Sequence, residues 1–197
     1  MEERKASLAR KTSETDISIS LSIDGAGVSS VDTGIGFFDH MLKSFAKHGF
    51  FDMSLVTKGD LYVDSHHTIE DTGIVLGKAI KEAIGDKSGI RRYGSFIMPM
   101  DETLVLCAVD LSGRPFLQYD LNLTTERVGY MDTEMVKEFF YAVSYSAEMN
   151  LHLKQISGSN NHHIIEAAFK AFANALNVAT RIDPRLDGEI LSTKGSL

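Results

Sequence analysis

The segments His66-His67-Thr68-Ile69-Glu70 and His162-His163-Ile164-Ile165-Glu166 are two copies of one H-H-x-x-E pattern. They hold four of the seven histidines and begin 96 residues apart, about half of the 197-residue chain. Each copy leads into a run of residues suited to a helix. Histidine and glutamate are strong ligands of borderline divalent metals, so the pattern predicts a duplicated fold with metals held between its halves.

The composition is typical of a globular protein, with 43% hydrophobic and 24% charged residues. A formal net charge of −7 argues against non-specific nucleic-acid binding. The single cysteine, Cys107, lies in an apolar run, so no disulfide is expected within the chain, which fits a reducing cytoplasm. No apolar run approaches the roughly 20 residues of a membrane span, so no membrane association is expected.

Periodicity predicts that one order of elements occurs twice: helix, strand, turn, H-H-x-x-E, helix. We therefore expect an α+β fold, a single domain over residues 1–197 made of pseudo-symmetric halves at about 1–90 and 91–197. Each half is expected to be a mixed β-sheet with two helices on one face. Gly49 and Gly85 are expected to end the first two helices. Strands are expected at 16–23, 50–57, 61–63, 94–100, 103–111, 116–123 and 151–156, and helices at 37–48, 68–84, 135–149 and 162–180.

Helix geometry predicts how the repeated histidines divide between two metals. Residues i and i+4 share a face of a helix, while neighbours point about 100° apart. The histidine that begins each pattern can therefore bind a metal together with its glutamate, while the second histidine serves the other metal. One site would take His66, Glu70 and His163, the other His162, Glu166 and His67, and His40 and His152 would each add one ligand.

Four nitrogen and oxygen ligands leave open positions on a six-coordinate metal. That set suits Mn(II), with Fe(II), Co(II) and Zn(II) as competitors. Asp64 and Asp71 are expected to accept hydrogen bonds from the imidazoles and so orient them.

Motifs along the whole chain resemble those of the imidazoleglycerol-phosphate dehydratase family. They are Arg10-Lys11-Thr12-Ser13-Glu14-Thr15, Asp39-His40-Met41-Leu42, His48-Gly49, Asp64 to Asp71, Asp110 to Pro115, Asn161 to Ala167, and Ser192-Thr193-Lys194-Gly195. Ser65, where some members have Asp or His, and the short segment after Lys194 are small departures.

The resemblance implies dehydration of imidazoleglycerol phosphate to imidazole acetol phosphate, a step of L-histidine biosynthesis. It further implies two Mn(II) ions per active site and a half-domain fold like the second domain of ribosomal protein S5. The implied homo-oligomer is a shell of twenty-four subunits with active sites between subunits. The chain has no spare length for the phosphatase domain to which some members are fused.

The resemblance also assigns roles to individual residues. Glu14 is the implied acid/base, and His48 contacts the substrate, with a structural role for His48 equally open. His40 adjoins the substrate as well as a metal. A metal on the substrate ring would favour an imidazolate that expels the hydroxyl, giving a diazafulvene-like intermediate. The implied phosphate contacts are Arg92, Arg114, Ser192, Thr193 and Lys194.

Two other classes of protein compete with this interpretation. A dinuclear phosphoester hydrolase would usually use aspartates and a bridging carboxylate, whereas this set is rich in histidine. A metal-storage shell protein would need no phosphate-binding residues, and Glu14→Gln would then have no effect. We favour the dehydratase over both.

Overall fold

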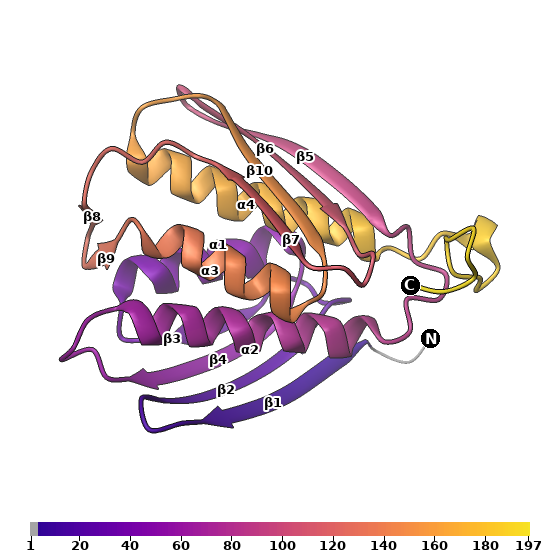
Figure 1. The fold of residues 1–197 in the computed structure, drawn as a ribbon, viewed down its shortest axis with the longest axis horizontal. Helices are drawn as coiled ribbons and strands as arrows, with labels where there is room; N and C mark the ends of the chain where they lie inside the picture. Colours follow the sequence, from indigo (N-terminus) through magenta and orange to yellow (C-terminus); the bar gives the residue numbers. More distant parts are fainter. Residues whose placement is uncertain (1–3) are drawn as a thin grey trace.

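The computed structural model describes residues 4–197 and consists of two β-sheets with four α-helices between them (Figure 1). A short 3-10 helix, η1 (Pro184–Leu186), follows the last α-helix. None of the helices in the described range is both long and apolar enough to span a membrane. The α-helices are α1 Gly36–Gly49, α2 His66–Ile84, α3 Met135–Ser146 and α4 Asn161–Thr180.

Each half of the chain contributes one mixed four-stranded sheet. The first has the strand order β1-β2-β4-β3 and the second β5-β6-β10-β7. In both, one pair is parallel (β3 with β4, β7 with β10) and the other pairs are antiparallel. The strands are β1 Lys5–Lys11, β2 Thr15–Ser22, β3 Ser29–Asp32, β4 Asp52–Gly59, β5 Tyr93–Met100, β6 Thr103–Asp110, β7 Phe116–Asp120 and β10 Asn150–Ser157, while β8 Arg127–Val128 and β9 Met131–Asp132 form a separate ribbon.

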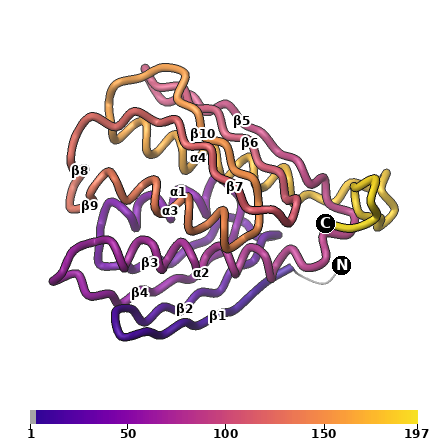
Figure 2. The backbone as a smooth tube through the Cα atoms, in the orientation of Figure 1, coloured from indigo at the N-terminus to yellow at the C-terminus, as the bar shows by residue number. Residues whose placement is uncertain are grey.

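The helices of the two halves pack against one another in the middle of the molecule. α2 lies on the first sheet and α4 on the second, while α1 packs on α4 and α3 packs on α2 (Figures 1 and 2). Each half is thus a mixed sheet with two helices on one face, as the sequence predicts. The division into halves near residue 90 stays a prediction.

The interior between the helices is rich in aromatic side chains. Phe169 on α4 is fully buried, with its ring centroid 5.0 Å from that of Phe139 and 4.9 Å from that of Phe140 on α3. Phe45 on α1 stacks on Phe172, 5.3 Å away. Aromatic rings bury large apolar areas, so this cluster joins the halves into one core.

Glycines let α2 and α3 approach closely. A Cβ at Gly73 would lie 2.9 Å from the carbonyl oxygen of Phe139, and one at Gly77 would lie 2.7 Å from that of Val143. Both distances are shorter than any ordinary contact, so side chains at these positions would push the helices apart.

Several predicted boundaries were wrong. Residues 61–63 form a turn rather than a strand, because Val63 donates its N–H to the carbonyl of Asp60 (2.8 Å). Gly49 is the last residue of α1, and Phe50 takes the left-handed conformation that ends it (φ 57°). α2 begins at His66 instead of residue 68, and strands β1 and β3 were missed.

Truncation of the central aromatic ring should destabilise the fold. We expect Phe169→Ala to lower the free energy of unfolding by about 3–5 kcal/mol, because it removes buried apolar area and leaves a cavity. Phe169→Leu, which refills much of the space, should cost less than half of that. Denaturant unfolding of metal-free protein measures both, and a loss below about 1 kcal/mol for Phe169→Ala would contradict this account of the core.

Candidate active site

Side chains from both halves meet where the first turn of α4 faces α1. His40 comes from α1, and His162 and Glu166 come from α4. Oε2 of Glu166 lies 3.2 Å from Nε2 of His162 and 3.5 Å from Nε2 of His40. One ligand atom of each residue lies within 4.8 Å of the other two, and no second such cluster occurs in residues 4–197. We call these residues the His–Glu triad.

The triad combines a buried carboxylate with two more exposed imidazoles. The Glu166 side chain is only 9% exposed, and its other oxygen, Oε1, is 2.7 Å from Nζ of Lys170. Burial opposes ionisation, but the hydrogen bond from Lys170 and the nearby histidines outweigh it, so the pKa of Glu166 lies below its usual value. The carboxylate is therefore ionised at neutral pH, and two imidazole nitrogens with one carboxylate fit a divalent transition metal.

The N-terminus of α4 is held by an asparagine cap. Oδ1 of Asn160 accepts hydrogen bonds from the backbone N–H groups of His162 (3.0 Å) and His163 (3.4 Å). The cap fixes the start of the helix, and with it the directions of both histidines.

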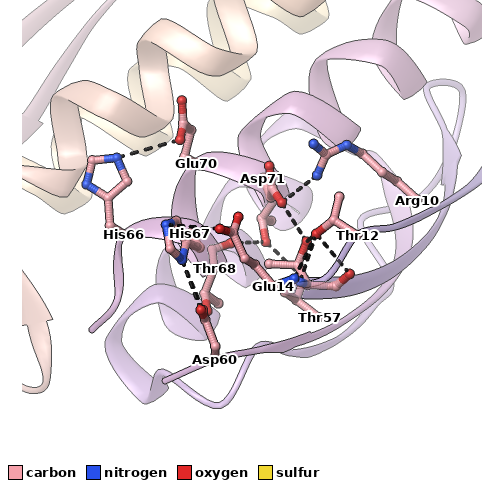
Figure 3. Close-up of polar contacts among 12 residues, drawn as sticks. Arg10, Thr12, Glu14, Thr57, Asp60, His66, His67, Thr68, Glu70 and Asp71 are labelled. Atoms are coloured by element: carbon pink, nitrogen blue, oxygen red, sulfur yellow. Dashed lines mark hydrogen bonds and ion pairs between the residues drawn. The ribbon is translucent and has the colours of Figure 1, made fainter. Parts of the chain in front are cut away.

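The first-half copy of the pattern is arranged differently (Figure 3). Nε2 of His66 lies 3.6 Å from Oε2 of Glu70, as the i, i+4 spacing predicts. His67 points toward Asp60, with Nδ1 3.0 Å from Oδ2, and its Nε2 is 3.8 Å from Oε1 of Glu14. The hydrogen bond with Asp60 raises the pKa of His67.

His163 has a similar environment in the second half. Its Nδ1 is 2.8 Å from Oε2 of Glu102, and its Nε2 is 3.8 Å from Oδ2 of Asp101. The hydrogen bond raises the pKa of His163 and lowers that of Glu102 to about 2.

The carboxylates that orient the imidazoles are not those expected from the sequence. Asp64 accepts the backbone N–H of His66, the first residue of α2 (2.8 Å), rather than an imidazole N–H. Asp71 pairs with Arg10 and accepts the hydroxyl of Thr15 (2.5 Å). The sequence missed Asp60 and Glu102, because each lies outside the H-H-x-x-E segment that it supports.

The hairpin that carries Glu14 is fastened to α2. Asp71 pairs with Arg10 on β1 (Figure 3) and accepts a hydrogen bond from Thr15 on β2, so it contacts both strands of the hairpin. At the turn, Oγ1 of Thr12 accepts the N–H groups of Glu14 (3.1 Å) and Thr15 (3.0 Å). The contacts hold the Glu14 carboxylate beside the histidines of α2.

Neither His48 nor His152 belongs to the triad, although His48 is near enough to Glu166 for that carboxylate to influence its pKa. His48 is near the end of α1, where burial, followed by the positive charge of Lys170, lowers its pKa. His152 is exposed on β10, with its ring 5.6 Å from that of Phe116 on β7. The chain does not bring His152 into a cluster with other ligands, and His66, Glu70 and His163 do not meet within the described residues.

The repeat indicates one more residue that the sequence reading missed. Phe50, directly after α1, and Glu148, two residues after α3, both have a left-handed backbone, with φ of 57° and 52°. Alignment of the two helix ends places Glu138 of α3 at the position of His40 in α1, ten residues earlier in each case. The packing of Gly73 on Phe139 puts this part of α3 next to the first turns of α2.

The predicted phosphate contacts line one hollow at the other end of the molecule. Its volume is about 750 Å³. Arg92 is engaged there, with Nε 2.7 Å from Oδ1 of Asp110 and one terminal nitrogen donating to the carbonyl of Leu191 (2.9 Å). The guanidinium of Arg114 has no polar partner in residues 4–197. The lining includes Arg92, Arg114, Ser192, Thr193 and Lys194.

The length of α4 separates this hollow from the triad. The backbone N–H of Arg92 donates to the carbonyl of Ala179 (2.9 Å) in the last turn of α4, whereas His162 is in the first turn. At 1.5 Å per residue the two points are about 25 Å apart. A small phosphorylated imidazole is too short to contact both within one chain.

Comparison with known proteins shows the family to which the chain is similar. The family model for imidazoleglycerol-phosphate dehydratase matches residues 33–176. The protein of that name from Lachnoclostridium phytofermentans is 68% identical over 194 residues, covering 98% of each chain. The Staphylococcus aureus structure has a TM-score of 0.83 at 42% identity over 91% of this chain and 99% of that chain. The Pyrococcus furiosus structure, a complex with (S)-C348, has a TM-score of 0.84 at 38% identity over 96% and 100%.

The fold and these similarities define the protein as a dehydratase, a lyase that eliminates water. The chain belongs to the imidazoleglycerol-phosphate dehydratase family. The family resemblance and the fold class predicted from the sequence are thereby confirmed.

Proposed function

We propose that this protein removes water from imidazoleglycerol phosphate to give imidazole acetol phosphate, in histidine biosynthesis, and that it depends on Mn(II). The 68% identity to a dehydratase of that name over 98% of the chain carries the proposal. A single buried thiol, Cys107, is compatible with a reducing cytoplasm, where we place the reaction.

The histidines and glutamates of the repeat would hold two Mn(II) ions per active site. The His–Glu triad would hold one together with His67, and His66, Glu70 and His163 would hold the other.

His152 is the further ligand of the second site that the sequence predicts. Glu138 competes for that role because the repeat gives it the position that His40 has in the first half. The bound ions would supply Lewis acids at the substrate's ring nitrogens, which favours the imidazolate form of the ring.

Glu14 is the proposed proton-transfer group. The hydroxyl must leave the carbon next to the ring, giving a diazafulvene-like form, and a proton must leave the following carbon to give an enol that becomes the ketone. Glu14 lies beside His67 on a hairpin fastened by Asp71, so its carboxylate is held close to a proposed metal ligand. A fixed carboxylate within reach of the side-chain carbon suits proton transfer. His48, whose pKa is lowered by burial, would contact the substrate as a neutral imidazole.

The hollow beside the C-terminal segment would bind the phosphate. Arginine forks suit phosphate oxygens, and Arg114 and Lys194 are free to turn toward one. Arg92 would act partly by holding Leu191, and so the segment that carries Ser192, Thr193 and Lys194.

The separation of the two regions supports an active site formed between subunits. Within residues 4–197 the triad does not meet His67, and His66 and Glu70 do not meet His163, so the metal ligands as well as the phosphate contacts would come from more than one copy. We propose that residues 1–90 and 91–197 act as one domain within a homo-oligomer of twenty-four subunits, as the family resemblance implies.

Return of metal to metal-stripped protein tests the reaction and the cofactor. With imidazoleglycerol phosphate present, we expect dehydration to return as Mn(II) is titrated and to saturate at about two ions per chain. Phosphate release instead of dehydration would favour the phosphoester hydrolase. Mn(II) binding without turnover by the assembled protein would favour the storage shell.

Removal of the acid/base group should affect turnover more than binding. We expect Glu14→Gln to lower kcat by about 10²–10⁴-fold, with KM and Mn(II) affinity nearly unchanged, because the amide keeps the shape but cannot transfer the proton. Steady-state kinetics and calorimetry measure the two effects. An unchanged kcat would remove Glu14 from the mechanism.

Hybrid assemblies test whether the site is shared between chains. His162→Ala and Arg114→Ala should each be inactive alone, while co-expression should restore about a quarter of the sites, those that combine an intact triad with an intact phosphate hollow. The matched control is co-expression of His162→Ala with His40→Ala. It should restore nothing, because every triad then carries one defect. Failure of the first pair, in assemblies shown to be mixed, would contradict a site between subunits.

A further inference from the structure

The second histidine of each H-H-x-x-E pattern contacts a carboxylate through Nδ1, but the two carboxylates come from different places in the fold. His67 and His163 each direct Nδ1 at a carboxylate, at 3.0 Å from Asp60 and 2.8 Å from Glu102. In both residues Nε2 has no partner within hydrogen-bond distance among the described residues, the nearest carboxylate oxygen lying 3.8 Å away. The two rings therefore present the same nitrogen outward.

The two carboxylates do not occupy equivalent positions in the repeat. Asp60 lies just after β4, in the loop that leads to the helix of His67. Glu102 lies in the turn between β5 and β6, 61 residues before His163. If duplication alone explained the Nδ1–carboxylate contact, equivalent residues would make it in both halves. Because Asp60 and Glu102 are not equivalent, the contact indicates that the histidines themselves require a carboxylate at Nδ1.

We propose that Asp60 and Glu102 are positioning residues, which keep the proton of His67 and His163 on Nδ1 and so present the Nε2 lone pair to a metal ion. A carboxylate can only accept the hydrogen bond, so the neutral ring must carry its proton on the bonded nitrogen. Such a partner also fixes the ring orientation and makes the ligand more basic. The inference rests on the proposed Mn(II) role of these histidines.

The surroundings of the two carboxylates differ in a way that separates their amide variants. Oε1 of Glu102 accepts the backbone N–H groups of Asn160 (2.9 Å) and Ser159 (3.3 Å), while Oε2 faces His163. In Glu102→Gln these two donors would retain the amide oxygen, so the NH2 group would face Nδ1. That group can only donate, which moves the ring proton to Nε2 and blocks the metal-binding nitrogen.

Asp60 has no such second attachment. Its two side-chain oxygens contact only Nδ1 of His67 within residues 4–197, at 3.0 and 3.3 Å. The amide of Asp60→Asn can therefore turn its oxygen toward Nδ1 and keep the same tautomer. Asp60→Asn and Glu102→Gln each remove one negative charge, but only Glu102→Gln should block the metal-binding nitrogen of its histidine.

Calorimetric titration of metal-stripped protein with Mn(II) tests the inference. We expect Glu102→Gln and Asp60→Ala each to weaken one class of Mn(II) site by about 10- to 100-fold, and Asp60→Asn to weaken it by less than about fivefold. Asp64→Asn is the matched control. This variant removes a charge near His67 but keeps the side-chain oxygen that accepts the backbone N–H of His66. Its Mn(II) affinity should therefore match that of the unaltered protein.

The thermal unfolding midpoint of each metal-free variant shows whether Mn(II) binding is weakened by a lost positioning contact or by a destabilised fold. Weakened Mn(II) binding with an unchanged metal-free midpoint supports positioning. Equal losses in Asp60→Asn and Glu102→Gln, or unchanged affinity in Glu102→Gln, would overturn the inference while leaving the Mn(II) proposal intact. Failure of the unaltered protein to bind Mn(II) would overturn both.

Discussion

The packing of each half's helices against the helices of the other half is the constraint on which the site depends. α1 lies on α4 and α3 on α2, so neither half completes its core alone. Buried aromatic rings fill the space between the helix pairs, and Gly73 and Gly77 set the close approach of α2 and α3. Because α1 crosses to α4, His40 of the first half reaches Glu166 of the second. The candidate metal-binding triad is thus a direct product of the way in which the core is closed.

Hydrogen-bonded carboxylates add orientation to this placement. Glu166 is kept ionised in a largely buried position because Lys170 and two histidines surround it. Asp60 and Glu102 each form a hydrogen bond with Nδ1 of His67 and His163, and both ring orientations follow from these contacts. Asp71 does not touch an imidazole, but it ties the Glu14 hairpin to the helix of His66 and His67. A buried or partly buried polar group needs such partners, and here the partners also set the geometry of the site.

The distance along α4 links the fold to the proposed assembly. Its first turn carries the triad and its last turn adjoins the hollow lined by Arg92 and Arg114, so one rigid element keeps the two parts of the proposed site apart. Rigid separation within a chain is useful when the chain associates, because one copy can present its ligands to the hollow of another without any rearrangement. It also explains why the ligands of the first-half repeat, His66 and Glu70, lie near the start of α2 without a third donor from their own chain.

The sequence by itself determined the duplicated architecture and the i, i+4 His–Glu pairs. Both follow from periodicity, which is local: Glu70 and Glu166 come to His66 and His162 because a helix repeats every 3.6 residues. The motifs also determined the family. Only the tertiary structure decided that His40 joins the triad while His152 faces outward on a sheet. It alone showed that Asp60 and Glu102 contact the second histidines of the repeat, and that the hollow lined by Arg92 and Arg114 lies a helix length from the triad. These relations join residues that are distant in sequence through the packing of helices and sheets, and no local pattern in the chain records that packing.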